Sequence, residues 1–281
     1  MSVPNEISPN DIKNPFKRDE IISTIPEFVE VYSKRPIKDN SGGMKFNHCF
    51  AVWFMAKKLN PKFIIESGTW YGQSTWLLEN ACPSAKIFCL DINFSRLHYK
   101  SKSATYIQKD FSTIDWSGIE PEKTLCFFDD HQNQYQRLKE ACWIGIKNII
   151  FDDNYSPNEG DVYSLRKILS GTGHTNLVVP RKYDLNPIYR LMKLLIIYLS
   201  NNFFKHNQLL LVDPNLNDRN NFLKKINSYV EFPPVFIENI SKNETILQKN
   251  TPLLNSLQSI QNLEKSFDSD DYFNIGYVQL I

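Results

Sequence analysis

One stretch of the sequence decides the fold and reads Phe63-Ile-Ile-Glu66-Ser-Gly68-Thr-Trp-Tyr-Gly72-Gln-Ser74. An apolar run ends in an acid, a glycine turn follows, and the apolar spacing predicts a helix from Ser74 on. A second apolar run, Lys86–Asp91, ends in another acid. A strand, a glycine turn, a helix and a second strand form a βαβ unit, which binds nucleosides at the carboxyl ends of its strands.

The two glycines indicate which nucleoside is bound. Gly68 and Gly72 allow the backbone to pass close to a ligand, and the helix that follows offers free N–H groups. Their spacing is G-x-x-x-G, whereas a dinucleotide pyrophosphate needs G-x-G-x-x-G. The spacing therefore favours S-adenosylmethionine, which has no diphosphate. Asp91 then lies where a carboxylate can accept hydrogen bonds from both ribose hydroxyls.

The composition is that of an ordinary soluble globular protein. The chain has 281 residues, of which 42% are hydrophobic and 22% are charged. This length allows one large domain with an insertion, or two smaller domains. The net charge is +1 and no run of five or more basic residues occurs, so no nucleic-acid partner is expected.

The cysteines and the apolar segments indicate a cytoplasmic protein. The five cysteines are an odd number without C-x-x-C spacing, which indicates reduced thiols. The first residues contain no apolar stretch or basic region, so no signal peptide is expected. The apolar run Leu191–Leu199 is much shorter than the roughly 20 residues that span a bilayer. No membrane span is expected, and we predict a buried helix or a helix that faces a second subunit in a homodimer.

Strands and helices alternate over the first half of the chain. A helix at Asn47–Leu59 precedes five predicted strands, at residues 63–67, 86–92, 105–108, 124–128 and 148–151. Helices are predicted between the strands, at residues 74–80, 95–100 and 134–145. This alternation predicts an α/β fold with a parallel sheet and helices on both faces.

The alternation breaks after Asp153. Helices are predicted at residues 163–169, 188–204 and near 221–230, and two late strands at 235–237 and 275–280. We therefore divide the chain into four parts. These are an N-terminal arm or lid at 1–45 with a short helix at 26–33, a cofactor-binding α/β core at 46–154, a mostly helical insertion at 155–230 as a substrate cover, and closing strands of the core at 231–281.

Acidic residues follow all five predicted strands, at Glu66, Asp91, Asp110, Asp129-Asp130 and Asp152-Asp153, the last pair followed by Asn154. A single acid at such a place can simply cap the next helix. Five in succession along one sheet edge indicate a binding site. Carboxylates and an amide after two neighbouring strands suit a hard divalent cation such as Mg²⁺ or Ca²⁺. The alternative is an ordinary polar sheet edge with one acid near the cofactor.

Over residues 60–155 the chain resembles the catechol O-methyltransferase-like enzymes, which are class I S-adenosylmethionine-dependent methyltransferases. The resemblance lies in Glu66-x-Gly68-x-Trp70-x-Gly72-x-Ser74, Asp91-Ile92-Asn93, Asp130-His131 and Asp153-Asn154. A weaker resemblance is to metal-dependent sugar O-methyltransferases of antibiotic pathways. The resemblance implies a seven-stranded Rossmann-like sheet, which closes with an antiparallel pair of strands, and here carries a helical insertion after strand 5.

The resemblance also implies a role for individual residues. The implied cofactor-binding residues are Glu66, Gly68, Thr69, Trp70, Gly72, Ser74, Asp91, Ile92, Asp110, Phe111 and His131. The implied metal ligands are Asp130, Asp153 and Asn154, and the implied catalytic residues are Asp130 and His131.

One position departs from the pattern of the family. Its members carry a lysine base two residues after the histidine, where this chain has Asn133. Either the base lies elsewhere, for example in the insertion, or a metal alone acidifies the substrate hydroxyl. His131 is better suited to the cofactor than to base catalysis, and His174, which lies between glycines, is more typical of a turn.

These observations predict a methyltransferase that uses S-adenosylmethionine and a divalent metal such as Mg²⁺. Its acceptor would be a hydroxyl of a sugar or another small molecule with a diol. Three other interpretations remain: a metal-independent methyltransferase, a non-catalytic partner subunit with the same fold, and a nicotinamide-dependent oxidoreductase. The glycine spacing disfavours the last of these.

Overall fold

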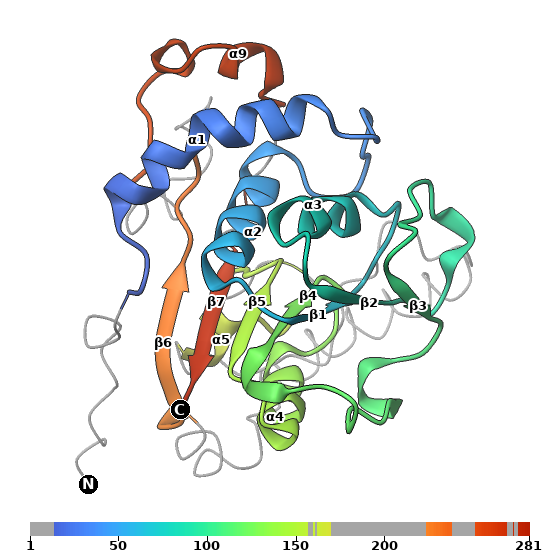
Figure 1. The fold of residues 1–281 in the computed structure, drawn as a ribbon. Coiled ribbons are helices and arrows are strands. Elements are labelled where there is room, and N and C mark those ends of the chain that lie inside the picture. The colour runs from blue at the N-terminus through green and yellow to red at the C-terminus, as the bar shows by residue number, and fades with distance from the viewer. Residues whose placement is uncertain are drawn as a thin grey trace, which may run out of the picture.

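The computed structural model describes residues 14–156, 160, 162–169, 223–237, 251–268, 272 and 275–281. In this part of the chain, helices pack on both faces of a seven-stranded sheet (Figure 1). The strand order is β3-β2-β1-β4-β5-β7-β6. The first five strands are parallel, and β7 is antiparallel to both of its neighbours. The predicted seven-stranded α/β sheet is thereby confirmed.

The strands are β1 (Phe63–Ser67), β2 (Lys86–Leu90), β3 (Thr105–Ile107), β4 (Thr124–Phe128), β5 (Asn148–Phe151), β6 (Ile226–Glu231) and β7 (Gly276–Leu280). The bounds of β1, β4 and β5 are those predicted. These strands are buried on both faces of the sheet and therefore read as continuous apolar runs. The strand predicted at 235–237 is wrong. The helix predicted near 221–230 is wrong from Ile226 on, where the sixth strand begins.

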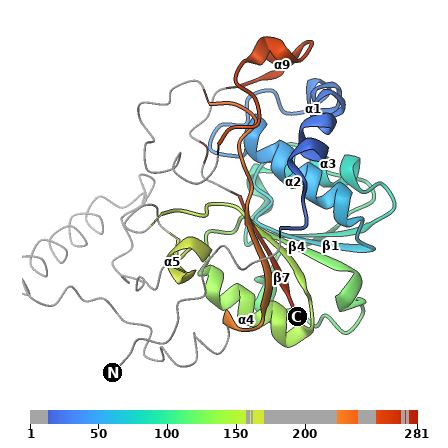
Figure 2. The same ribbon diagram turned by 90° about the vertical axis from the view of Figure 1, so that its left-hand side faces the viewer.

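The helices lie in two layers (Figure 2). One face of the sheet is covered by α1 (Arg18–Ser33), α2 (Phe46–Leu59) and α3 (Gln73–Ala81), and the other by α4 (Gln134–Ile144) and α5 (Leu165–Leu169). The short helix α9 (Leu263–Ser266) packs beside α1. Alternate strand residues feed the two cores: Ile64 and Phe127 pack under α1 to α3, whereas Ile65 and Phe128 pack toward α4.

Short 3₁₀ turns occupy Phe94–Arg96 (η2), Phe111–Thr113 (η3), Pro121–Lys123 (η4) and Leu257–Ser259 (η6). The helix predicted at 95–100 is therefore wrong beyond the turn η2. The N–H groups of His98 and Tyr99 donate to the carbonyl oxygen of Tyr71, at 3.0 and 2.9 Å. These bonds to the glycine loop replace the hydrogen bonds that a helix would make.

The segment predicted as an arm contains a complete helix. Helix α1 begins at Arg18 and continues through Pro26, where a short helix was predicted to begin. Proline inside a helix costs about 3 kcal/mol. The buried stripe of α1 offsets this cost, since the ring of Phe28 lies 5.3 Å from that of Trp53 and 5.2 Å from that of Phe50 on α2. A lid function for residues 1–45, like the rest of the domain division, stays a prediction.

The first turn of α2 is fixed by residues far along the chain. The N–H of Phe46 donates to Oδ1 of Asp268 at 2.9 Å, which places a carboxylate at the positive end of the helix. Asn47 accepts from the N–H of Val235 at 2.9 Å and donates to the carbonyl of Phe236 at 3.0 Å. These bonds hold the start of α2 in one position relative to the strands after it.

Within the described residues, no helix has the length and apolar character required to cross a membrane. The apolar helix predicted at 188–204 and the turn around His174 lie outside the described residues.

Candidate functional site

The carboxyl ends of β1, β4 and β5 form one edge on which the predicted acids gather. The hydrogen-bond ladder continues one residue past each strand: the N–H of Asp129 donates to Ser67 at 2.8 Å, and that of Asp152 donates to Phe128 at 3.0 Å. The sheet itself therefore fixes the starting direction of these loops.

Three residues other than glycine at this edge have left-handed backbone. Trp70, His131 and Asp153 have φ angles of 48°, 52° and 55°. Positive φ is uncommon outside glycine, and such residues concentrate at functional sites, where the surrounding structure holds them. They turn the chain sharply after β1, β4 and β5.

The two glycines of the loop are required by contacts within the protein. A Cβ on Gly68, whose φ is +92°, would lie 2.1 Å from the carbonyl oxygen of Asp129. A Cβ on Gly72, whose φ is +91°, would lie 2.3 Å from the carbonyl oxygen of Tyr99. The missing side chains thus allow neighbouring loops to pack together, in addition to any role toward a ligand.

Glu66 is fully buried at the end of β1. Its Oε2 accepts a hydrogen bond from the hydroxyl of Thr75 at 2.6 Å. Its Oε1 has no hydrogen-bond partner. Burial raises the pKa of Glu66 to about 7.

Glu66 makes the stability of the cofactor-free protein depend on pH. Its pKa of about 7 lies above the ordinary value of 4.5, so the folded protein keeps a proton that the unfolded chain releases between these values. The free energy of unfolding therefore falls as the pH rises from 4.5 to 7. At pH 8 we expect the free energy of unfolding of Glu66→Gln to exceed that of the wild type by about 3 kcal/mol. At pH 4 the two values should be similar.

Urea unfolding at pH 4, 6 and 8 measures this effect. The exposed carboxyl of Glu122 provides a matched control, Glu122→Gln. Asp129 and Asp152, whose pKa values are also raised by burial, are expected to contribute to the pH dependence that remains. If the free energy of unfolding varies with pH in the same way in Glu66→Gln and in the wild type, Glu66 does not cause the pH dependence.

Asp91 ties the glycine loop to β2. Its Oδ2 accepts from the N–H groups of Thr69 and Trp70, at 3.1 and 3.3 Å, and its Oδ1 accepts from the N–H of Asn93 at 2.9 Å. The next side chain, Ile92, is apolar and 77% exposed. This arrangement suits the predicted contacts, in which the carboxylate of Asp91 would bind the ribose and the apolar side chain of Ile92 would lie against the adenine.

Trp70 links the glycine loop to the N-terminal segment. Its indole N–H donates to the carbonyl of Ser41 at 3.2 Å. Its ring stacks on that of Tyr71 with centroids 4.8 Å apart, and the guanidinium of Arg96 lies 4.8 Å from the ring centroid. The chain just before α2 therefore touches the predicted cofactor loop.

Arg137, on α4, joins two of the predicted acids and was not predicted itself. This buried guanidinium contacts Asp110 at 2.5 Å, Asp130 at 2.9 Å and Glu140 at 2.8 Å. The bonds from Arg137 hold the pKa of the Asp110 carboxyl well below its usual range. The ring of Phe111 is fully buried in the core, so only its backbone remains for the predicted adenine contact.

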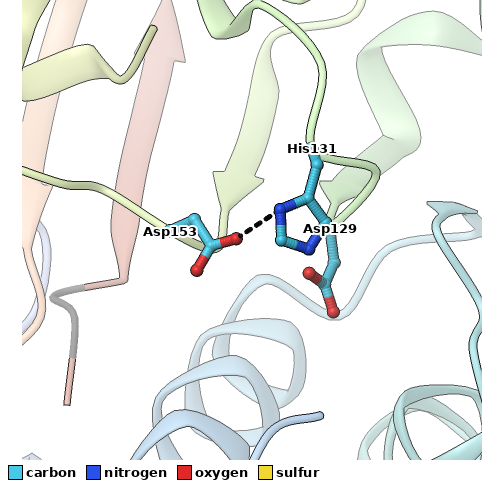
Figure 3. A group of neighbouring side chains, drawn as sticks. All are labelled: Asp129, His131 and Asp153. Carbon is cyan, nitrogen blue, oxygen red and sulfur yellow. Dashed lines mark ion pairs between the residues drawn. The ribbon is translucent and has the colours of Figure 1, made fainter. Parts of the chain in front are cut away.

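One group of side chains among the described His, Cys, Asp and Glu residues could hold a metal ion, and it consists of Asp129, His131 and Asp153 (Figure 3). One potential ligand atom from each lies within 4.8 Å of the others. Nδ1 of His131 is 3.1 Å from Oδ2 of Asp153. Burial and the charges of Asp152 and Asp153 raise the pKa of Asp129 well above its ordinary value. A cation among these groups would relieve that repulsion.

Two residues of the predicted metal trio, Asp130 and Asn154, have hydrogen-bond partners within the protein, and the trio with Asp153 stays a prediction. Oδ2 of Asp130 accepts from the hydroxyl of Ser67 at 2.7 Å and from Nε of Arg137 at 3.0 Å. The amide of Asn154 donates to the hydroxyl of Tyr229 at 2.8 Å and accepts from the N–H of Arg166 at 2.9 Å. Of the predicted trio, Asp153 also belongs to the group with Asp129 and His131.

A small cavity beside this group is lined by Phe128, Asp129, Asp130, His131, Gln132, Gln134, Phe151, Asp152, Asp153 and Val162. Asp152 is buried, and its Oδ1 has no hydrogen-bond partner. Nε2 of His48, on α2, lies 3.9 Å from this oxygen. His48 was not predicted as a site residue, because the sequence pattern does not distinguish it from the other buried residues of α2.

The strand order, with β7 antiparallel between β5 and β6, is that of the enzymes which the cofactor loop resembles. The chain has the class I methyltransferase fold. A comparison with models of protein families gives no match, and a comparison with curated proteins gives none either.

Similar solved structures include several methyltransferases. The S-adenosylhomocysteine-bound methyltransferase PaMTH1 of Podospora anserina is 14% identical, with 96% of this chain and 98% of that chain covered and a TM-score of 0.41. The O-methyltransferase TomG of Streptomyces achromogenes is 10% identical, with 96% and 91% covered and a TM-score of 0.40. The plantazolicin methyltransferase BpumL is 13% identical, with 94% and 99% covered and a TM-score of 0.38. Identities and scores this low do not transfer an activity to this methyltransferase-fold chain.

Proposed function

We propose that this chain is an S-adenosylmethionine-dependent O-methyltransferase that uses a divalent metal and acts on a hydroxyl of a small molecule or glycan. One observation supports this best. The glycine loop, fastened to Asp91, lies on the same sheet edge as the group Asp129, His131 and Asp153. Methyl transfer needs a site for the methyl donor, here the glycine loop, next to a site for a metal-bound hydroxyl, here this group.

The residues around the glycine loop fit the proposed cofactor. Oε1 of Glu66 and both amide atoms of Gln73 are buried without hydrogen-bond partners. Buried polar atoms are nearly always paired, so these atoms are suited to a polar ligand. Gln73 directly follows Gly72 and was not predicted as a site residue. The exposed side chain of Ile92 offers an apolar contact for a base.

The residues of the group fit a hard divalent cation. Two carboxylates suit Mg²⁺ or Mn²⁺, and the imidazole of His131 favours Mn²⁺ over the predicted Ca²⁺. When bound, S-adenosylmethionine supplies the methyl group from its sulfonium. The metal supplies a Lewis acid that lowers the pKa of the substrate hydroxyl.

The side chains of the protein position the reactants. Asp129 and Asp153 would hold the cation at the ends of β4 and β5, and Asp91 would hold the ribose at the end of β2. Because the sheet fixes all three strand ends, the hydroxyl and the methyl group would meet in a set geometry, which supplies much of the rate increase.

Calorimetry with S-adenosylhomocysteine tests the cofactor proposal. We expect the wild type to bind it in preference to NAD, and Asp91→Asn to bind it at least about tenfold more weakly, since one charged hydrogen-bond acceptor contributes about 1.5–3 kcal/mol. Asp115→Asn, which changes an exposed aspartate in the loop after η3, is the matched control. No binding of S-adenosylhomocysteine by the wild type, or tighter binding of NAD, would refute the proposal.

The ion pair of Asp130 with Arg137 favours a second candidate, a metal-independent methyltransferase. In it, the pair His131–Asp153 would orient the acceptor without a cation. Full turnover in excess chelator would favour this candidate.

A further inference from the structure

A second pair of ionisable side chains lies beside the proposed metal group. Nε2 of His48 and Oδ1 of Asp152 are 3.9 Å apart, and both residues are more than 90% buried. This separation is too long for a hydrogen bond. Oδ1 of Asp152 has no other hydrogen-bond partner, and a buried carboxylate oxygen left in this way is costly. A hydroxyl has a single hydrogen atom, which it could donate to Nε2 of His48 with the carboxylate of Asp152 close by.

We propose that His48 accepts the proton of the substrate hydroxyl, and that Asp152 stabilises the imidazolium that forms. This inference rests on the proposed function. The chain has Asn133 where the enzymes that it resembles carry a lysine, so a proton acceptor on the protein would be a residue of another element. Helix α2 supplies a histidine that contacts a residue of the same cavity as Asp129, His131 and Asp153.

His48 is held in a fixed position, as a general base must be. The two residues before it are anchored to distant parts of the chain, Phe46 through Asp268 and Asn47 through the backbone of Val235 and Phe236. Its ring packs on that of Tyr272, with centroids 4.7 Å apart. The imidazole therefore has little freedom to turn away from Asp152.

Several ionisable groups lie around His48. Asp152 faces it from the end of β5, with Asp153 and His131 beyond, Tyr272 packs on its ring, and Asp268 lies at the start of α2. In the proposed step, the hydroxyl proton passes to Nε2 and the oxygen forms a bond to the methyl carbon. The carbon–sulfur bond breaks, and its electron pair stays on sulfur. The products are a methyl ether and S-adenosylhomocysteine, and the imidazolium then loses its proton to water.

An NMR titration of the histidines tests the pairing without an acceptor. The full chain with S-adenosylhomocysteine is compared with Asp152→Asn, and the His48 signal is assigned with His48→Gln. We expect the pKa of His48 to fall by about one unit or more in Asp152→Asn, because an opposite charge at this distance favours the imidazolium. Lys57→Gln, at the exposed far end of α2, should leave it unchanged. An unchanged pKa in Asp152→Asn would overturn the proposal.

Methyl transfer to two catechols tests the role. With 3,4-dihydroxybenzoate, we expect His48→Gln to lower kcat about 100-fold and to change the affinity for S-adenosylhomocysteine by no more than a few-fold. With 4-nitrocatechol, which is largely ionised at neutral pH, the loss should be much smaller. Equal losses with both would indicate a structural role and overturn the proposal.

The two hypotheses fail separately. If the wild type does not bind S-adenosylhomocysteine, the proposed function fails. If it binds and His48 does not respond to Asp152, only the present inference fails. If the wild type methylates neither catechol, the titration decides the pairing by itself.

Discussion

The Gly68→Ala variant is expected to lose roughly 2–5 kcal/mol of stability, a large share of the 5–15 kcal/mol typical of a folded protein. Two causes add. Left-handed backbone costs an alanine about 1–2 kcal/mol, and Gly68 has a φ of +92°. The new Cβ would also lie 2.1 Å from the carbonyl oxygen of Asp129, and overpacking of this kind costs about 1–3 kcal/mol.

Urea unfolding measures this loss, and Gly118→Ala is its matched control. A Cβ on Gly118 would meet no atom within 4 Å, and its φ is not positive, so the control should be almost neutral. Because the contact of Gly68 is with the loop that carries Asp129 and His131, any folded variant should also bind metal more weakly. An unfolding midpoint close to that of the wild type would show that the loops do not pack as described.

The Asp153→Ala variant is expected to lose metal binding and metal-dependent turnover. Loss of even an outer-shell partner typically costs 10–100-fold in metal affinity, so removal of a ligand should cost at least about 100-fold. The affinity for S-adenosylhomocysteine should stay within a few-fold, because the cofactor loop belongs to β1 and β2. Electron paramagnetic resonance of Mn²⁺ gives the metal affinity, and calorimetry gives that of the cofactor product.

Two further variants separate the structural group from the trio that the family resemblance implies. If the group in Figure 3 binds the cation, Asp129→Ala loses Mn²⁺. If the implied trio binds it, Asp130→Ala causes the greater loss. Asp115→Ala is the control for an exposed aspartate. Wild-type Mn²⁺ affinity in Asp153→Ala would refute both sets of ligands.

Most of the sheet could be predicted because its central strands are buried on both faces. The apolar runs of β1, β4 and β5 have the length of buried strands and are too short for typical helices. The sixth strand was missed because Ile226–Glu231 is only partly buried and is paired with one neighbour, β7. Its hydrogen-bond partners lie some 50 residues further along the chain, which no local pattern reveals.

The sequence predicted the edge of the sheet at which the candidate site lies, but not the contacts of each side chain there. Acids after parallel strands must meet at one edge, so the approximate place was predictable. Whether Asp129 or Asp130 faces Asp153 depends on a hydrogen bond to Ser67 and on an arginine one helical turn into α4. Asn154 is engaged in the same way by Tyr229 and Arg166. Such choices come from tertiary contacts, as does the position of His48.

The position of β7 has a consequence for the order in which the protein assembles on the ribosome. Residues 276–280 lie between β5 and β6 and pair with both. Until these residues leave the exit tunnel, β5 is an open edge and β6 has no strand beside it. A nascent chain therefore exposes unpaired strand edges from the emergence of β5 until that of β7, and we expect chaperones that shield such edges to act on it in that interval.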